Sequence, residues 1–205
     1  MKKLIVFDLD QTLLYTLPRF HRVFCSLLGR EIPWDEFIKH YAADSLNIYI
    51  NGDKNEFWKR FLKSYYPPHP GDRPIDGAAE TLKILRDRGF KIVVHTGRII
   101  PKNLLWDELK IFGLAGFVDD VYPEDENFKE STFDKSPKLI EIKEKYSPDF
   151  FAFVGDYWPD MVSGKRAGAF VIGVLTGLEK EEKLKKYGAD VVVKSVAEVP
   201  EVLPI

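Results

Sequence analysis

Short apolar runs alternate with helical stripes along most of this chain. Runs at 4–7, 92–94 and 150–154 are each followed by polar or small residues, which is typical of buried strands in a parallel sheet. Between the runs, apolar residues recur with the 3.6-residue period of amphipathic helices. Strands that alternate with helices predict an α/β fold, in which helices cover both faces of a mainly parallel sheet.

A different pattern fills residues 17 to 66, where helical stripes follow one another. Gly29 and the pair Asn51-Gly52 separate these stripes, and a proline-rich link over 65–74 follows them. We therefore expect a small helical cap over 15–72, inserted in a core made of 1–14 and 73–205. The stripes consist of Phe20, Val23, Phe24, Leu27 and Leu28, then Trp34, Phe37, Ile38, Tyr41 and Ala42, then Trp58, Phe61, Leu62 and Tyr65. Such aromatic stripes are typical of packing between helices.

Start and stop signals place three helices of the core. Asp76 is a candidate N-cap for a helix that ends at Gly89. Pro101 predicts the start of a second helix, with Gly113 beyond its end. Ser136, followed by proline, is the expected N-cap of a third.

Composition excludes several classes of protein. The 205 residues suit one domain with a small insert, and the formal net charge of −2 gives no reason to expect a nucleic-acid partner. The one cysteine, Cys25, excludes an intramolecular disulfide and suits a cytoplasmic protein. The first apolar run stops at Asp8, too early for a signal peptide, and no stretch approaches the length of a membrane span.

Two carboxylates at the end of the first apolar run are the most informative feature. Asp8 and Asp10 are two residues apart in extended chain, so their side chains share a face. Open α/β sheets bind ligands at the carboxyl ends of their strands. Two like charges held together there require a cation, a shared proton or a catalytic task.

Other strand ends supply complementary groups. The second run ends in Thr96, a hydroxyl donor, and Gly97, whose backbone can approach an anion closely. The third ends in Gly155 and Asp156, with Asp160 four residues later. Lys135 lies just before the proline-started helix. Carboxylates, a hydroxyl and a cation are thus delivered to one edge of the expected sheet.

In this order the motifs resemble those of the haloacid dehalogenase superfamily. The family's D-x-D-x-T is matched by Asp8, Asp10 and Thr12, and its strand-terminal Thr or Ser by Thr96. The family lysine is matched by Lys135, and G-D-x-x-x-D by Gly155, Asp156 and Asp160. The resemblance covers residues 1 to 14 and about 73 to 193, and it implies a Rossmann-like core with a cap.

The resemblance also implies phosphoryl transfer through an aspartyl-phosphate. Asp8 is then the nucleophile, and Mg²⁺ is held by the Asp8 carboxylate, the Asp10 backbone carbonyl and the Asp156 carboxylate. Lys135 and Thr96 are expected to hold the phosphoryl oxygens, together with backbone amides near Leu9, Asp10 and Gly97. We expect Asp160 to orient the metal or the lysine from behind. Oxygen ligands without Cys or His suit Mg²⁺.

Asp10 distinguishes the possible reactions. As general acid and then base, Asp10 can protonate a leaving oxygen and activate water. Family members that cleave carbon–halogen bonds generally lack this second aspartate. The chain is therefore expected to be a Mg²⁺-dependent phosphatase acting on a small phosphorylated metabolite. A sugar phosphomutase of the same family is the nearer alternative, and a phospho-acceptor signalling module that does not turn over is the alternative from another class.

Three further residues leave choices open. Gln11 occupies a position where family members commonly carry glycine, so it is either a substrate contact or a side chain that faces outward, the interpretation we favour. Lys135 is preferred over Lys138 as the catalytic cation, because Lys138 falls in the first helical turn, where the macrodipole disfavours a cation. His95 is expected to be structural. The pair Asp119-Asp120 and the acidic loop over 123–127 are expected to be solvated, without a role.

Overall fold

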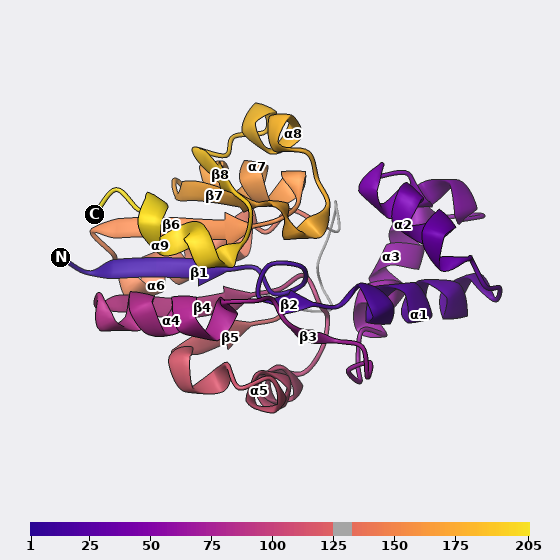
Figure 1. Ribbon diagram of the computed structural model, residues 1–205, viewed down its shortest axis with the longest axis horizontal. Coiled ribbons are helices and arrows are strands. Elements are labelled where there is room, and N and C mark those ends of the chain that lie inside the picture. The colour runs from indigo at the N-terminus through magenta and orange to yellow at the C-terminus, as the bar shows by residue number, and fades with distance from the viewer. Residues whose placement is uncertain (125–132) are drawn as a thin grey trace.

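The larger lobe is built on a six-stranded parallel sheet (Figure 1). The computed structural model describes residues 1–124 and 133–205, so most of the acidic loop over 123–127 lies outside the described residues. Along the sheet the strand order is β5-β4-β1-β6-β7-β8. The strands are β1 Lys3–Phe7, β4 Phe90–His95, β5 Asp120–Tyr122, β6 Phe150–Gly155, β7 Phe170–Val174 and β8 Val191–Val193.

Side chains on alternate positions of each strand fill two apolar cores, one on each face of the sheet. In β1, Ile5 and Phe7 belong to one core and Leu4 and Val6 to the other. The first core includes residues of α4 Ala78–Asp87, α5 Lys102–Ile111 and α9 Val199–Val202. The second includes residues of α6 Ser136–Tyr146, α7 Trp158–Arg166 and α8 Glu181–Lys186. The expected Rossmann-like α/β fold is confirmed.

The three central strands end level with one another. Phe7 of β1 pairs with Val94 of β4 on one side and with Val154 of β6 on the other. After β1 the chain builds β4 and β5 on one side and then crosses to build β6, β7 and β8 on the other. Residues that follow β1, β4 and β6 therefore meet where the direction of building reverses, which is where such sheets bind ligands.

Three helices form a smaller lobe with its own apolar core. They are α1 Leu17–Leu28, α2 Trp34–Ala42 and α3 Lys54–Lys63, with a 3-10 turn at Leu46–Tyr49. Their shared core includes Phe24 and Phe37, which are fully buried. The chain enters and leaves the lobe through an antiparallel ribbon of β2 Leu14–Tyr15 and β3 Arg73–Pro74. Figure 1 shows this lobe at the carboxyl end of the sheet, opposite the two termini.

Helix boundaries differ by one residue from those expected at two places. The N-cap of α4 is Gly77, with a positive φ of 81°, and not Asp76. The N-cap of α6 is Lys135, and Ser136 is already helical. Ser136 donates its backbone N–H to the Asp134 carboxylate at 2.9 Å, so the aspartate, and not the serine, supplies the capping oxygen.

Acidic residues that were expected to be solvated make structural contacts. Asp119 accepts a hydrogen bond from the backbone of Ile92 at 2.8 Å, and Asp120 pairs with Lys102 and Lys145. Both carboxylates thus tie the edge strand to its neighbours, and the expectation was wrong.

His95 is fully buried, as a structural residue would be. Its Nε2 lies 3.3 Å from the Glu124 carboxylate, which is also buried. Glu124 therefore departs from the solvated loop expected there.

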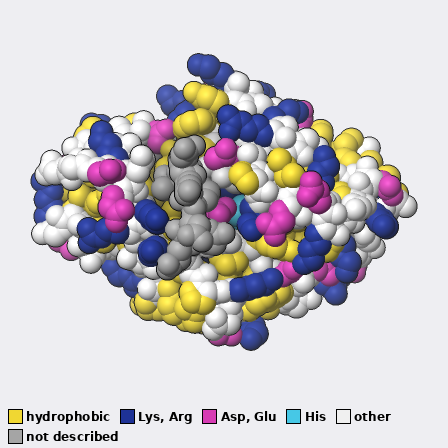
Figure 2. All heavy atoms as spheres, turned by 180° about the vertical axis from the view of Figure 1, so that it is seen from behind, with side chains coloured by type: hydrophobic (Ala, Val, Ile, Leu, Met, Phe, Trp, Pro, Cys, Tyr) yellow, Lys and Arg dark blue, Asp and Glu magenta, His cyan; other side chains and the backbone are white. Residues whose placement is uncertain are grey.

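Charges of both signs are interspersed on the face shown in Figure 2, and apolar side chains lie between them. Short 3-10 turns complete the fold at Ala115–Phe117, Leu175–Gly177 and Val196–Glu198. In the described parts of the chain, no helix is long and apolar enough to cross a membrane.

Candidate active site

A buried lysine between two carboxylates marks the centre of the site. Lys135, the N-cap of α6, places its Nζ 2.5 Å from Asp8 Oδ1 and 2.8 Å from Asp160 Oδ1. Asp8 directly follows β1 and donates its backbone N–H to the carbonyl of Val154 at 2.8 Å. Asp160 lies in the first turn of α7 and also accepts the backbone N–H of Tyr157 at 3.2 Å. The sequence motifs that were expected to meet do so here.

Asp156 adds a third carboxylate to this cluster. Carboxylate oxygens of Asp8, Asp156 and Asp160 all lie within 4.8 Å of one another, and all three residues are buried. Thr12 donates its hydroxyl to Asp156 at 3.2 Å, which ties the turn after β1 to the end of β6. With Lys135 as their nearby cation, the three carboxylates carry excess negative charge, as a divalent-cation site does.

Two glycines let the backbone approach these carboxylates. A Cβ at Gly155 would lie 2.6 Å from Asp160 Oδ2, and one at Gly177 would lie 1.8 Å from Asp156 Oδ2. Neither distance is possible for a real side chain, so both positions require glycine.

Burial and mutual repulsion shift the pKa values of the carboxylates upward. Desolvation raises the pKa of Asp8 to about 7, with Lys135 opposing the shift and Asp160 and Asp10 adding to it. The pKa of Asp156 is raised well above its usual range by desolvation and by the charges of Asp8 and Asp160. Burial alone would lower the pKa of Lys135, but Asp160 and Asp8 outweigh burial and raise it. The lysine is therefore held as a cation, and the carboxylates favour any further cation that binds.

Asp10 is held apart from this cluster by a bidentate ion pair. Arg98 donates from Nε to Asp10 Oδ2 at 2.8 Å and from a terminal nitrogen to Oδ1 at 2.6 Å, and Thr16 donates its hydroxyl to Oδ1 at 2.6 Å. Burial would raise the pKa of Asp10, but the charge and hydrogen bonds of Arg98 prevail and lower it. This arrangement keeps Asp10 ionised, which is the form that can accept a proton, and it lowers the proton affinity of the carboxylate.

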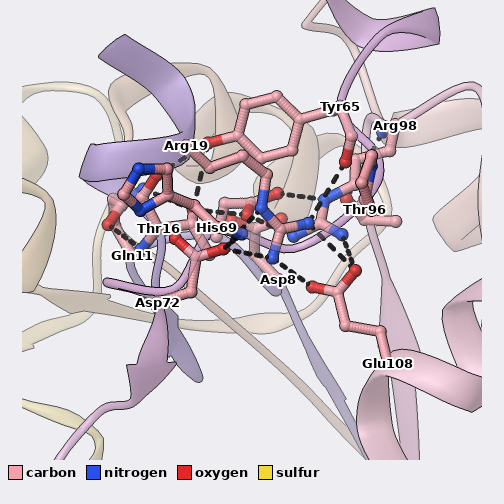
Figure 3. Close-up of polar contacts among 12 residues, drawn as sticks. Asp8, Gln11, Thr16, Arg19, Tyr65, His69, Asp72, Thr96, Arg98 and Glu108 are labelled. Atoms are coloured by element: carbon pink, nitrogen blue, oxygen red, sulfur yellow. Dashed lines mark hydrogen bonds and ion pairs between the residues drawn. The ribbon is translucent and has the colours of Figure 1, made fainter. Parts of the chain in front are cut away.

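Arg98 belongs to a buried chain of alternating charges (Figure 3). Glu108 of α5 accepts from Arg98 at 2.7 Å and from Arg19 of α1 at 2.8 and 2.9 Å. Arg19 also donates to Asp72 at 2.7 Å. Asp10 is therefore linked both to the segment by which the chain enters the smaller lobe and to the segment by which it leaves.

Sequence reasoning missed this network. Two signals were present, because Glu108 lies three residues after Leu105 on the apolar face of its helix, and Arg98 directly follows Thr96 and Gly97. A charged residue on an apolar helix face needs a partner, although the sequence does not show which one.

Gln11 is buried and does not face outward, which corrects the interpretation favoured from the sequence. Its backbone has a φ of 60°, in the left-handed region where glycine is the usual residue. Its side chain accepts the Thr16 backbone N–H at 3.1 Å and donates to the Thr16 hydroxyl at 2.9 Å. These bonds offset the strain and fix the hydroxyl that contacts Asp10.

The remaining candidates meet at the same edge. Thr96 is buried after β4, and its hydroxyl accepts the backbone N–H of Arg98 at 3.3 Å. Gly97 lines the cavity described below, and Leu9 is fully buried in the turn after Asp8. Lys138 instead pairs with Glu141 on its own helix at 2.5 Å. The geometry thus places Lys135, and not Lys138, against the Asp8 carboxylate.

A cavity of about 180 Å³ extends from these carboxylates toward the smaller lobe. Its floor includes Asp8, Asp10, Asp156 and Lys135, and its opposite wall includes aromatic residues of α1, α2 and α3. The smaller lobe therefore covers the strand ends.

A second group of potential ligands lies within the smaller lobe. Ligand atoms of His21, Cys25 and Glu31 lie within 4.8 Å of one another. The His21 Nε2 is already engaged by the carbonyl of Ile32 at 2.6 Å, and desolvation raises the pKa of the Cys25 thiol. Both features oppose metal ligation, so we assign no role to this group.

Comparison with known proteins decides the family. The family model of haloacid dehalogenase-like hydrolases matches residues 5–174. The chain belongs to this family. The resemblance seen in the sequence is confirmed, and so is the expectation that the chain is a hydrolase.

Curated relatives of this chain are named as phosphatases. It is 27% identical over 203 residues to pyrophosphatase PpaX of Bacillus pumilus, with 95% of this chain and 93% of the relative covered. It is 26% identical over 234 residues to a phosphoglycolate phosphatase of Vibrio vulnificus, with 98% and 96% covered. These names support the phosphatase class expected from the sequence.

Solved structures confirm the fold. A protein described as a predicted phosphatase, from Clostridium acetobutylicum, superposes with a TM-score of 0.79 at 23% identity, with 98% of this chain and 97% of the other covered. A protein assigned as a β-phosphoglucomutase, from Thermotoga maritima, superposes with a TM-score of 0.67 at 19% identity, with 98% and 97% covered. At these identities the likeness extends to the fold alone.

Proposed function

We propose that this protein is a Mg²⁺-dependent phosphatase that hydrolyses a small phosphorylated metabolite through an aspartyl-phosphate on Asp8. The observation that carries the proposal is the buried contact of Lys135 with Asp8 and Asp160, beside Asp156 and at the floor of a cavity. The names of the curated relatives, pyrophosphatase and phosphoglycolate phosphatase, support the class of reaction.

Electrostatics explain why the site needs more than its carboxylate nucleophile. A carboxylate and a phosphate dianion about 4 Å apart repel by roughly 8 kcal/mol at an effective dielectric of about 20. Lys135 offsets part of this repulsion, because its ammonium lies within hydrogen-bond distance of Asp8. Thr96, the amide of Gly97 and the amides near Leu9 and Asp10 complete the proposed cradle for the phosphoryl oxygens.

The carboxylate cluster fits a magnesium ion. The donors are buried oxygens with a net negative charge, which suits Mg²⁺. Asp8 and Asp156 would hold the ion, with the backbone carbonyl of Asp10, and Asp160 would hold Lys135 in place. When bound, the ion would neutralise charge on the phosphoryl group.

Asp10 is the proposed acid and base. The pair with Arg98 keeps Asp10 ionised, so Asp10 is in the form that would take a proton from the attacking water in the second half-reaction. To protonate a leaving group first, Asp10 must gain a proton when substrate enters. Replacement by Asn should therefore spare activated aryl phosphates more than alkyl phosphates, and equal losses for the two classes would exclude Asp10 as the acid.

Phosphate release from a panel of phosphorylated metabolites tests the proposal directly. Turnover should require Mg²⁺ and stop in excess chelator. Undiminished turnover in chelator would overturn the metal-dependent mechanism.

The same samples separate the alternatives. A phospho-acceptor module would accumulate the acyl-phosphate without releasing phosphate, whereas a phosphatase would release many equivalents per protein. A phosphomutase would return a phosphorylated isomer. Because proteins assigned as mutase and as phosphatase share this fold, product analysis is the measurement that distinguishes the two.

Residues 15–72 are proposed to act as a cap that excludes water. The cap contacts the core beside the cavity, where Tyr157 and Trp158 donate to the Asp44 carboxylate at 2.7 and 3.1 Å. Such closure strengthens electrostatic interactions inside the site and admits only small substrates. Faster turnover of phosphoproteins than of small phosphomonoesters would contradict this role.

A further inference from the structure

We infer that the natural substrate carries its phosphoryl group on an uncharged, apolar group about the size of one aromatic ring. The inference rests on the proposed phosphatase function and specifies its substrate class. The names of the relatives instead point to substrates with a second anionic group, a phosphate or a carboxylate. Three properties of the cavity carry the inference: its walls, its charges and its size.

The wall opposite the carboxylates is aromatic and continuous. Phe20 and Phe61 of the smaller lobe lie with ring centroids 4.4 Å apart, and Trp58 follows at 5.2 Å from Phe61. Phe133 of the core continues the wall, 6.2 Å from Trp58 and 5.6 Å from Tyr157. All five rings line the cavity. A charged leaving group would lose its hydration against these rings, whereas an apolar ring would gain contacts.

The charges of the lining also disfavour a second anion. Among the described residues of the cavity, the cations are Arg98 and Lys135, and each is paired with two carboxylates. A magnesium ion at the carboxylate cluster would face the phosphoryl group itself. In the described lining, no cation is left for a distal carboxylate or phosphate.

Two further carboxylates of the cavity lining share a single cation. Asp44 and Glu179 line the cavity and share one lysine, Lys183, at 3.1 and 2.9 Å. One cation for two carboxylates leaves this part of the cavity with a net negative charge. A second anionic group would be repelled here, while an uncharged ring would not.

Size limits the leaving group to about one ring. The cavity holds about 180 Å³. A cavity of about 150 Å³ lined by apolar side chains binds benzene. Because the space here must also hold the phosphoryl group, it leaves room for one ring at most and excludes a nucleoside.

Two substrates with similar chemistry test the inference in the unmodified protein with Mg²⁺. Benzyl phosphate and phosphoglycolate are both phosphate esters of primary alcohols, but one leaving group is an apolar ring and the other is an anion. We expect kcat/KM for benzyl phosphate to exceed that for phosphoglycolate and for pyrophosphate by tenfold or more. Equal or faster turnover of either anionic substrate would overturn the inference.

Choline phosphate tests whether the aromatic wall is a cage for a cation. Aromatic faces also attract quaternary ammonium groups. Preference for choline phosphate over benzyl phosphate would therefore overturn the inference that the leaving group is uncharged. Turnover of phosphoglycolate with none of benzyl phosphate would refute this inference and leave the proposed function standing. No phosphate release from any of these compounds, nor from an activated aryl phosphate, would refute the proposed function as well.

Paired phenylalanine variants connect the preference to the wall. Phe133→Ala should lower kcat/KM for benzyl phosphate about tenfold and change that for activated acyl phosphates less than threefold. Phe112→Ala removes an equally half-buried ring that packs on the core away from the cavity, and it should change neither. Equal effects of the two variants on benzyl phosphate would overturn the assignment of the wall.

Discussion

The edge of the sheet and the smaller lobe that covers it are stabilised by opposite means. At the edge, three buried carboxylates lie close together, and one lysine pairs with two of them. In the smaller lobe, eleven buried residues, six of them Phe, Tyr or Trp, form a core of their own. Repulsion and desolvation at the edge cost stability, whereas apolar burial in the lobe provides it.

The difference teaches which part of the molecule performs which task. Groups that react must be held close to like charges, and the rigid sheet supplies that restraint because β1, β4 and β6 end level with one another. Groups that select a substrate depend on shape more than on charge. Because the helical lobe has its own core, residues that it contributes to the cavity can change without disturbing the carboxylates at the edge of the sheet. The chain of charges from Asp72 to Asp10 is where the two regions meet.

Asp8→Asn should have the largest effect, and on activity alone. The amide is a poor nucleophile, so kcat/KM should fall on the order of 10⁴-fold or more. The free energy of unfolding of the metal-free protein should not fall, because the change removes one of three clustered charges. Phosphate release and urea denaturation measure the two quantities. Substantial turnover by the variant would contradict the nucleophile assignment.

Phe24→Ala should act in the opposite way to Asp8→Asn, because its main effect should be on stability. Phe24 is fully buried in the smaller lobe and stacks on Trp58 with ring centroids 5.8 Å apart. Its loss should lower the free energy of unfolding by about 3–5 kcal/mol. Ile48→Ala, at a side chain that is 63% exposed on the same lobe, serves as control and should cost less than ~0.5 kcal/mol. Comparable losses in the two variants would mean that this core is not what stabilises the lobe.

Lys135→Ala tests the cation of the edge. Loss of a preorganised donor should lower kcat/KM by about 10²–10³-fold, with some loss of stability because Asp8 and Asp160 are left unpaired. Lys138→Ala, three residues later, should change kcat/KM less than twofold. The reverse ranking would move the catalytic cation to Lys138.

Magnesium should raise the melting temperature of the protein. A ligand that binds the folded state stabilises it by about 2.7 kcal/mol at 100 times its dissociation constant. The shift should disappear in Asp156→Asn, because this substitution removes a carboxylate of the cluster. It should persist in Asp149→Asn, a control at an exposed surface residue. A shift of equal size in both variants would locate the ion elsewhere.

Asp44→Asn should have the smallest effect on activity. Asp44 belongs to the smaller lobe and contacts Lys183 of the core, so the change affects the contact between the two regions. Asp44 has a φ of 52°, which asparagine tolerates, so the variant removes charge without adding strain. Weaker contact with Lys183 should raise KM about two- to fivefold and leave kcat unchanged. Asp35→Asn, exposed in the same lobe, provides the comparison. A large loss of kcat would give Asp44 a role in the chemistry instead.

Much of the fold was predictable because it follows from periodicity. The stripe that stops at Gly29 became α1, which ends at Leu28, and the runs before Asp8 and Asp156 became central strands. Helix starts were less accurate at α4 and α6, because capping depends on which nearby oxygen reaches a free N–H. At α6 that oxygen belongs to Asp134 and not to Ser136.

The motif residues at the strand ends were placed by sequence alone, since a parallel sheet brings the ends of its central strands together whatever the rest of the chain does. Spacing along the chain also favoured Lys135 over Lys138. The partners of Asp10 were not predictable in this way. Arg98 lies in the loop after β4, Glu108 in α5 and Arg19 in α1, and only packing decides that their charges meet.

Sequence by itself determined the order of strands and helices, the family and the groups at the sheet edge, because these depend on local periodicity and on short motifs. Tertiary structure decided that Gln11 turns inward, that Arg98 holds Asp10, and that aromatic rings from both lobes close over the carboxylates. Contacts between residues distant in the chain are set by how the two lobes pack, and no local pattern records that arrangement.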